Sequence, residues 1–511
     1  MTQFVSPVSP VPAPGSAPGP AVIRTHPEDD VAIALRALEP GESIQVDGFG
    51  LMVREPVERG HKIAVLPVQQ GDVVRRYGWP IGHATRNIGV GEPVHSHNLA
   101  TNLAGELPYA YEPAPRPPLA EPRPRSFEGY VRADGSVGVR NQLWVLPTVG
   151  CVARSAQKIA AEAGLRHQGQ VDEVLAFTHP YGCSQVGDDL DATARLLAAL
   201  AAHPNAGGVL ILGLGCESNQ ITPLLERLPP ERRARVRHVV AQDSLDERSA
   251  AGRALAELAE LAAEDRRTTV GLGALRLGLK CGGSDGLSGL TANPLIGRCA
   301  DAVIAAGGAA VLSEVPEIFG AERLLMARAA DRAVFDELVA LVNGFKRYFL
   351  DHGERVSENP SPGNIAGGIT TLEEKSLGAV QKGGSATVTG VIPYGGHLAG
   401  PGLSVLEAPG NDAVSTTALA AAGATITLFS TGRGTPLGGP TPTLKLATNH
   451  ALAQRKPGWI DFDAGQVLDD GMDVAAERLL DLICATASGQ PARNEVNDER
   501  SIALWKRGVT L

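Results

Sequence analysis

Residues 203–220 read HPNAGGVLILGLGCESNQ, an apolar run between glycines that is followed directly by small polar residues. The run at 209–212 predicts a buried β-strand, because four consecutive apolar residues bounded by glycine are too few for a buried helix. A helical pattern of alanine, leucine and charged residues precedes it at 188–202. This order is typical of the βαβ unit, in which successive strands run parallel.

The same alternation continues on both sides of this stretch. Further candidate strands lie at 143–147, 174–178, 236–241, 275–279 and 309–312, with candidate helices at 153–163 and 249–263. After a helical passage at 321–352, three more candidate strands lie at 386–391, 403–407 and 425–429. We therefore predict an α/β fold with two α/β domains, at 127–355 and 356–511, each built on a largely parallel sheet.

The N-terminal part of the chain differs in composition and in the pattern of its apolar residues. Residues 1–21 are rich in proline and alanine and predict a disordered tail. Residues 22–106 contain short apolar runs between turn pairs such as Asp47-Gly48, which predicts a small β-rich domain. Only residues 30–38 in this part have helical periodicity. Proline recurs through residues 107–126, which we interpret as a linker between domains.

The composition narrows the class of function. A formal net charge of -10 argues against nucleic acid or an anionic membrane as the main partner. No apolar run reaches the roughly 18 residues that span a bilayer, and six cysteines in 511 residues make a poor disulfide framework. We expect reduced thiols, a cytoplasmic location and a small-molecule partner. Whether the chain forms a homo-oligomer is left open.

Reactive side chains follow the predicted strands. Because ligands bind beyond the carboxyl ends of parallel strands, we expect these side chains to form one shared site. The candidate metal ligands are Cys151, Cys183, Cys216, Glu217, Cys281 and Asp285. His179 and Lys280 are candidates for proton transfer, and Glu314 and Glu317 follow a later strand.

Other polar residues are candidates for binding substrate or completing catalysis. Small polar side chains beside exposed backbone amides suit a polyhydroxylated ligand, and a cation suits its carboxylate. On this basis the candidates are Gln220, Ser284, Asn364, Lys375 and Arg433. In the small domain, His95 and His97 are two residues apart, a spacing that on a strand places both imidazoles on one face.

The chain resembles the altronate/galactarate dehydratase family from residue 22 to about residue 464. The small domain carries DVAIALRAL, GHKIAV, YGWPIGHAT and HSHNLATN, and resembles the family's SAF-type β-clip module. The main body carries GYVRADGSVGVRN, HPYGCSQVGDD, GLGCESNQ, GLKCGGSDGLSGLTANP, SEVPEIFGAE and STGRGTPLG. The first of these adds Arg140 and Asn141 as candidate substrate contacts. GLGCESNQ and GCSQVGDD resemble altronate rather than galactarate dehydratase, whereas Gly150 stands where family members often carry asparagine.

The resemblance implies a hydro-lyase that removes water from D-altronate to give 2-keto-3-deoxy-D-gluconate, aided by Fe²⁺ or by Mn²⁺ or Mg²⁺. An iron–sulfur cluster on three cysteines is the alternative cofactor. The alternative functions are a galactarate or other hexonate dehydratase, a lyase on another 2-hydroxy acid, and a sugar-acid binding protein without catalysis.

Overall fold

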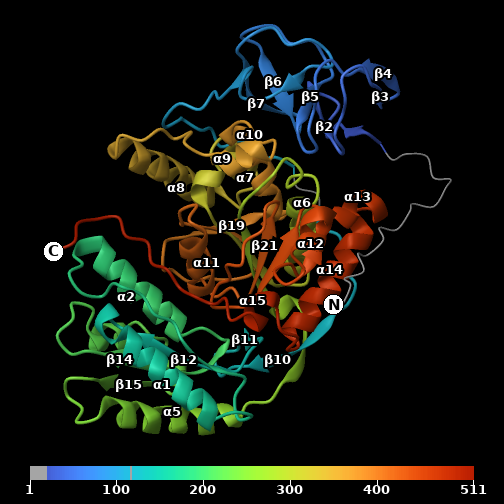
Figure 1. The fold of residues 1–511 in the computed structure, drawn as a ribbon. Helices are drawn as coiled ribbons and strands as arrows, with labels where there is room; N and C mark the ends of the chain where they lie inside the picture. The colour runs from blue at the N-terminus through green and yellow to red at the C-terminus, as the bar shows by residue number, and fades with distance from the viewer. Residues whose placement is uncertain (1–19, 116–117) are drawn as a thin grey trace, which may run out of the picture.

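The structure is a computed structural model that describes residues 20–115 and 118–511. The predicted tail therefore lies almost entirely outside the described residues. Figure 1 shows three bodies: a small β-rich domain at the top, a central body around one large sheet, and a smaller α/β unit at the lower left. The fold is α/β with a small β-rich N-terminal domain and parallel sheets, as predicted.

The N-terminal domain consists of short antiparallel strands around its own apolar core. One sheet has the order β1-β2-β5-β8, a second has the order β6-β7-β9, and β3 and β4 form a hairpin. Their bounds are β1 Val22–Ile23, β2 Val31–Ala34, β3 Ser43–Val46, β4 Phe49–Met52, β5 Lys62–Ala64, β6 Val73–Arg76, β7 Trp79–Ala84, β8 Pro93–Val94 and β9 Leu99–Ala100. The helical periodicity at 30–38 was misleading, because β2 is buried on both faces and so lacks the alternation of a half-exposed strand.

The chain then crosses to the main body without a helix or strand between β9 and β10, where it is described. This segment is hydrogen-bonded to the main body: the backbone amide of Ala114, for example, donates to the carbonyl of Ala327 at 3.0 Å. A small antiparallel sheet comes next, in the order β11-β10-β16. Its strands are β10 Ser126–Val131, β11 Val137–Gly138 and β16 Thr268–Gly271, so it joins the two ends of the middle unit.

The middle unit is a four-stranded parallel sheet with the order β13-β12-β14-β15. The strands are β12 Gln142–Pro147, β13 Val174–Ala176, β14 Ala206–Gly213 and β15 Val236–Val240. Successive side chains of β12 enter different cores: Leu143 and Val145 pack with α1 and α5, whereas Trp144 and Leu146 pack with α2. The helices are η1 Gly150–Val152, α1 Ala153–Arg166, α2 Gly187–Ala201, α3 Ile221–Glu226, α4 Pro230–Arg233 and α5 Glu247–Ala263.

The central body is built on a seven-stranded parallel sheet with the order β19-β20-β18-β17-β21-β22-β23. The strands are β17 Arg276–Cys281, β18 Ala309–Leu312, β19 Val388–Ile392, β20 Gly402–Leu406, β21 Ile426–Thr431, β22 Thr443–Ala447 and β23 Phe462–Asp463. This corrects the expected boundary at residue 355. β17 and β18 precede that boundary, but they pair with β21 and β20 beyond it.

Helices cover both faces of this sheet, and its strands are buried along most of their length. The longer helices are α6 Ala292–Ala305, α8 Arg332–Asp351, α10 Leu372–Ala379, α11 Asp412–Ala421 and α14 Met472–Ala487. The shorter elements are η2 Leu272–Ala274, η3 Val315–Glu317, α7 Glu322–Met326, α9 Pro362–Ala366, η4 Val380–Gly383, α12 His450–Arg455, η5 Ala464–Gln466, α13 Val467–Asp470 and α15 Arg493–Val496. Within the described part of the chain, no helix is both long and apolar enough to cross a bilayer.

Candidate functional site

The carboxyl edge of the seven-stranded sheet gathers a group of buried ionisable residues. Neighbouring strands each end in such a residue, as expected for ligand sites of parallel sheets. β17 ends in Lys280 and Cys281, β18 is followed by Glu314 and Glu317, and Asp412 begins α11 after β20. Glu314 has a left-handed backbone with φ 68°, a strained conformation that is concentrated at functional sites.

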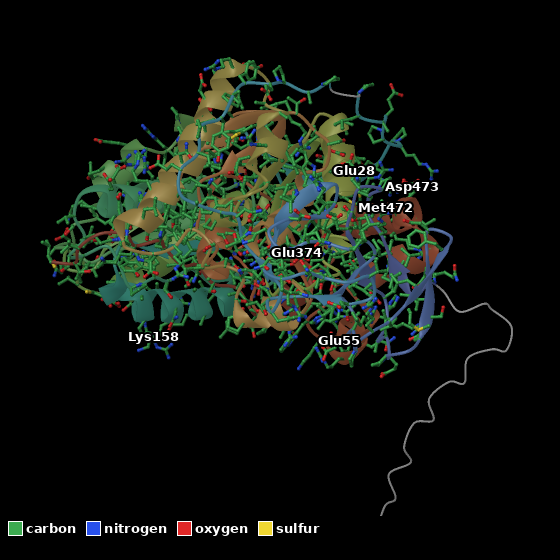
Figure 2. The ribbon with its side chains drawn as sticks, turned by 90° about the horizontal axis from the view of Figure 1, so that it is seen from above. Glu28, Glu55, Lys158, Glu374, Met472 and Asp473 are labelled. Atoms are coloured by element: carbon green, nitrogen blue, oxygen red, sulfur yellow. The ribbon has the colours of Figure 1, made fainter. Side chains whose placement is uncertain are left out.

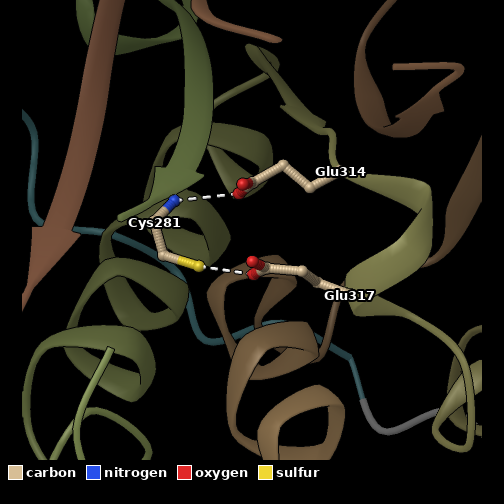
Figure 3. A group of neighbouring side chains, drawn as sticks. All are labelled: Cys281, Glu314 and Glu317. Carbon is tan, nitrogen blue, oxygen red and sulfur yellow. Dashed lines mark hydrogen bonds between the residues drawn. The ribbon is translucent and has the colours of Figure 1, made fainter. Parts of the chain in front are cut away.

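Cys281, Glu314 and Glu317 form a compact group of possible metal ligands (Figure 3). One ligand atom from each residue lies within 4.8 Å of the others, and all three residues are buried. The Cys281 thiol donates to Glu317 Oε2 at 2.7 Å, and the Cys281 backbone amide donates to Glu314 Oε2 at 3.0 Å. Within the described residues this is the one group of three such side chains at that spacing.

Three buried lysines surround this group. Lys280 donates to Glu314 and, at 2.7 Å, to Asp412 Oδ1. Lys375 Nζ lies 2.8 Å from Glu317 Oε1, and Lys382 Nζ lies 3.7 Å from Glu314 Oε2. The three ammonium groups therefore offset the carboxylates of Glu314, Glu317 and Asp412, and they place cationic hydrogen-bond donors beside the thiol that could also bind an anionic ligand.

Burial and these neighbours set the protonation states. Burial raises the pKa of the Cys281 thiol to about 12, so the thiol keeps its proton at neutral pH. Burial alone lowers the pKa of Lys280, but the charges of Glu314 and Asp412 outweigh it and the pKa lies above its ordinary value. Burial alone raises the pKa of Glu317, but Lys375 and Lys382 hold it below the ordinary range. Lys280 is thus a fixed cation and a poor base.

Hydrogen bonds from Lys375 through Asn364 to Ser284, the residue before Asp285, connect this group to Asp285. Lys375 donates to Asn364 Oδ1 at 3.1 Å, and Asn364 donates to the carbonyl of Ser284 at 2.9 Å. The buried Asp285 carboxylate accepts from Thr448 Oγ1 at 2.8 Å, and burial raises its pKa. Ser284, Asp285, Asn364 and Lys375, all predicted site residues, therefore lie in one network with Cys281. Arg433 is exposed at the edge of this network, and its backbone amide donates to the carbonyl of Gly283 at 3.1 Å.

The N-terminal domain docks directly on these loops. Lys62 donates to Gly368 O at 2.7 Å and lies 2.8 Å from Glu374 Oε2, and Arg76 contacts Glu374 Oε1 at 2.5 Å. All three side chains are at most 2% exposed. Figure 2 looks down on the molecule and shows Glu374 where the blue strands of this domain overlie α10. Arg76 also donates to Gly286 O at 2.8 Å, next to Asp285.

Two histidines of the N-terminal domain face the same loops. His95 Nε2 bonds the carbonyl of Ile365 at 3.1 Å, and the His95 and His61 rings stack with centroids 5.2 Å apart. Burial lowers the pKa of both imidazoles, so both are neutral at pH 7. The expected geometry of His95 and His97 was wrong, because both lie in the turn between β8 and β9 rather than on a strand. His97 is exposed there.

The prediction of one shared site for all the strand-end cysteines was wrong. Cys281 and Asp285 belong to the seven-stranded sheet, whereas the other five residues lie at the carboxyl edge of the four-stranded sheet. Those five are Cys151, His179, Cys183, Cys216 and Glu217. They form a second group, because the predicted strands fold into two sheets rather than one.

His179 is not placed for proton transfer. Its Nε2 bonds the carbonyl of Pro147 at 2.9 Å, and its Nδ1 accepts from the backbone amide of Tyr181 at 3.2 Å. Burial lowers its pKa to about 4, so it is a neutral imidazole that joins two loops. Glu217 is similarly engaged, accepting from the amides of Leu214 at 3.1 Å and Gly215 at 2.6 Å.

Three candidate substrate contacts have other partners. Arg140 and Asn141 precede β12 and lie at the amino edge of its sheet, opposite the edge where ligands bind. Arg140 pairs with Glu495 at 2.7 Å, and Asn141 donates to Ala262 O at 2.8 Å. Gln220 lies at the four-stranded sheet and donates to the carbonyl of Glu217 at 2.5 Å. None of the three contacts the Cys281 group.

Several residues of the site were not among the predicted ones. Glu314 and Glu317 had been noted after a strand, and their three-residue spacing across a turn was an available signal. Lys382, Glu374 and Lys62 had no local signal, since they reach the site through tertiary packing. A cavity of about 770 Å³ between the linker and α14 contains none of the candidate residues, so size alone does not mark the site.

Comparison with known proteins agrees with this architecture. The D-galactarate/altronate dehydratase C-terminal model matches residues 272–510, the second-domain model of that family matches 129–265, and its SAF-domain model matches 20–102. The chain belongs to the altronate/galactarate dehydratase family. The boundary between the two larger family domains falls before β17, where the structure also divides the sheets.

Named relatives span nearly the whole chain. It is 47% identical to altronate dehydratase of Bacillus subtilis, with 96% of this chain and 99% of the relative covered. It is 49% identical to altronate dehydratase of Escherichia coli, with the same coverage. Galactarate dehydratase (L-threo-forming) of Escherichia coli is 33% identical, covering 92% of this chain and 93% of the relative.

Proposed function

We propose that this protein is a hydro-lyase that removes water from D-altronate to give 2-keto-3-deoxy-D-gluconate. The choice of substrate rests on two relatives that are both named altronate dehydratase. They are 47% and 49% identical to this chain, and the match covers 99% of each relative. The lower identity of 33% to galactarate dehydratase makes galactarate the second candidate. The buried group of lysines and carboxylates around Cys281 supports a reaction on an anionic substrate.

The reaction requires concentrated positive charge. Removing the proton next to a carboxylate forms an enediolate with two negative charges, which only a preorganised cationic site stabilises. Lys280, Lys375 and Lys382 supply three ammonium groups within contact of Glu314 or Glu317. Because the pKa of each lysine lies above its ordinary value, these charges are permanent at neutral pH.

The residues fit a divalent metal ion by type and spacing. Cys281, Glu314 and Glu317 would hold the ion, and binding would displace the thiol proton of Cys281. A thiolate with two carboxylates suits Fe²⁺ better than Mg²⁺. When bound, such an ion supplies Lewis acidity toward the substrate carboxylate and 2-hydroxyl. Lys375 would not be left unpaired, because Asn359 Oδ1 at 3.0 Å and Asn364 Oδ1 at 3.1 Å also accept from its ammonium.

Proton transfer is assigned to the docked histidines. His61 and His95 are neutral, half-buried and bonded to the loop that carries Asn364. Because His95 Nε2 donates to the carbonyl of Ile365, its Nδ1, which lies 3.1 Å from Ser96 Oγ, is the unprotonated nitrogen that can act as a base. Arg433, exposed at the edge, suits the distal hydroxyls or the carboxylate of the sugar acid. The N-terminal domain then shields the reacting carbons from water by covering the loops.

The experiment is an anaerobic panel of hexonates and aldarates with protein stripped of metal and then supplied with Fe²⁺. We expect 2-keto acid from altronate, a much lower rate with galactarate, and no product before iron is added. Saturable binding of altronate without turnover would favour a sugar-acid binding protein. Full activity after exhaustive chelation would contradict the metal assignment.

A further inference from the structure

Three Gly-Cys dipeptides lie at the carboxyl edge of the four-stranded sheet, outside the site described above. They are Gly150-Cys151, Gly182-Cys183 and Gly215-Cys216. They follow β12, β13 and β14, three strands that are direct neighbours in the sheet order β13-β12-β14. Adjacent strands in a sheet are about 4.8 Å apart, so the three loops leave the sheet side by side.

Close packing against backbone requires glycine at 150 and 182, and a backbone φ of +128° favours it at 215. A Cβ at Gly182, where φ is +100°, would lie 2.0 Å from the carbonyl oxygen of Thr148. A Cβ at Gly150 would lie 2.9 Å from the carbonyl oxygen of Pro180, and one at Gly215 would lie 2.6 Å from Gln242 Oε1. The loops are thus packed against one another beside the thiols, and two of these contacts join the loops of Cys151 and Cys183.

Hydrogen bonds fix the three loops in place. The amide of Gly150 donates to Tyr181 O at 2.8 Å, and the amide of Asn219 donates to Gly182 O at 2.9 Å. The Asn219 side chain donates to Thr148 O at 3.0 Å, which ties the third loop to the first. His179 and Glu217 take part in these loop contacts rather than in ligand binding, because their polar atoms already bond the backbone of Pro147, Tyr181, Leu214 and Gly215.

The thiols themselves do not serve packing. Cys151, Cys183 and Cys216 are free and exposed, whereas Cys281 and Cys299 are buried. A free cysteine that packs as a small apolar residue is normally buried. A rigid framework that presents three exposed thiols at one edge is an arrangement for binding a thiophilic ligand.

The positions of the three sulfurs argue against a single metal ion bound by all three thiols. Tetrahedral coordination with metal–sulfur bonds of about 2.3 Å brings sulfurs to about 3.8 Å of one another. These three sulfurs do not meet a 4.8 Å limit as a trio, unlike the Cys281 group. In an iron–sulfur cluster each cysteine binds a different iron atom, so the ligand sulfurs lie farther apart than around a single ion.

We propose that Cys151, Cys183 and Cys216 are the protein ligands of a [4Fe–4S] cluster at this edge, separate from the Cys281 group. With His179 and Glu217 engaged elsewhere, the fourth iron has no protein ligand from these loops. Because the three thiols are exposed, that iron would be open to a small oxygen ligand such as water or a hydroxy acid. This proposal does not rest on the proposed dehydratase activity.

The test is anaerobic reconstitution of the full-length protein with ferrous iron and sulfide, followed by removal of unbound iron. We expect about four irons and four acid-labile sulfides per chain, with broad visible absorbance of a [4Fe–4S] cluster. Cys151→Ala, Cys183→Ala and Cys216→Ala should each lose most of that sulfide. Each is exposed, so far-UV circular dichroism and thermal unfolding should stay near those of the wild type.

Matched controls separate this site from the other thiols. Cys484→Ala, on α14, should keep the full complement of iron and sulfide. Cys281→Ala should also keep the sulfide-bound iron while losing iron added without sulfide. The proposal is overturned if the wild type takes up no acid-labile sulfide. It is equally overturned if the three variants retain the cluster, or if Cys484→Ala loses it to the same extent.

Discussion

Glu374 offers the sharpest test of how the N-terminal domain is held over the site. Its carboxylate lies 2.8 Å from Lys62 Nζ and 2.5 Å from Arg76, with all three side chains almost fully buried. Burial alone raises the pKa of Glu374, but the two cations hold it below the ordinary range. Burial lowers the pKa of Lys62 despite its partner. Lys62, Arg76 and Glu374 are all charged, because the one carboxylate of Glu374 accepts hydrogen bonds from both cations.

The variant Glu374→Gln removes the charge while keeping the volume. Lys62 would keep Gly368 O and Thr370 Oγ1 as acceptors, and Arg76 would keep Gly286 O, but both cations would lose their counter-charge. Removing one partner of a buried ion pair costs about 3–5 kcal/mol. If the whole of that cost falls on docking of the N-terminal domain, the undocked population rises by roughly 10²- to 4 × 10³-fold, at about 1.4 kcal/mol for each factor of ten.

Hydrogen exchange measures this directly. The backbone amide of Asn102 donates across the domain interface to Glu373 Oε1 at 2.7 Å and does not contact Glu374. Its protection should fall by the same factor in Glu374→Gln, and the KM for the sugar acid should rise. Glu55→Gln, an exposed change in the same domain, is the control and should leave both unchanged. Wild-type protection of Asn102 in Glu374→Gln would refute the reasoning.

Four further outcomes are expected. Cys281→Ala should lower both the iron bound without sulfide and the turnover by at least about 10²-fold, measured as metal content and 2-keto acid formation. Lys375→Met should lower kcat/KM roughly 10- to 100-fold through loss of one charge-assisted hydrogen bond, and an unchanged value would remove Lys375 from the site. His95→Ala should cut turnover strongly while His97→Ala, exposed in a turn, should not; equal effects would contradict the assignment to His95. The pKa of His179 is lowered to about 4 in the folded protein, so the unfolded chain takes up a proton at this residue first as pH falls. The free energy of unfolding should therefore keep its full contribution from His179 above about pH 6.5 and lose roughly 3 kcal/mol of it toward pH 4. In His179→Gln, unfolding curves measured across this range should show a smaller dependence of that free energy on pH.

Local patterns in the sequence were sufficient for the strands and for the side chains just after them. The apolar run at 209–212 lies within β14, and the run at 143–147 lies within β12. The position of Cys281 at the end of β17 was also predictable, because a strand that ends in a glycine-rich turn presents the next residues at the sheet edge. Periodicity did not identify β2, since a strand buried on both faces has no period-two signal.

Histidine roles could not be predicted from position alone. His179 follows a strand as a catalytic residue would, yet both of its ring nitrogens are bonded to backbone. His61 stood out in the sequence as part of GHKIAV, but the sequence did not show that it stacks on His95 beside the Asn364 loop. Whether an imidazole is free depends on partners from distant segments, which no local pattern records.

The sequence by itself determined the type and order of the elements, the β-rich N-terminal domain and the family, because these depend on local periodicity, glycine positions and long motifs. Only the tertiary structure decided which strands share a sheet. β17 and β18 have the same local pattern as β12 and β14, and pairing depends on which apolar faces fit together across hundreds of residues. That partition divides one expected site into two. The buried lysines, from Lys280 to Lys382, acquire their charge partners only through that packing, since burial is tolerable only where carboxylates from other strands meet them.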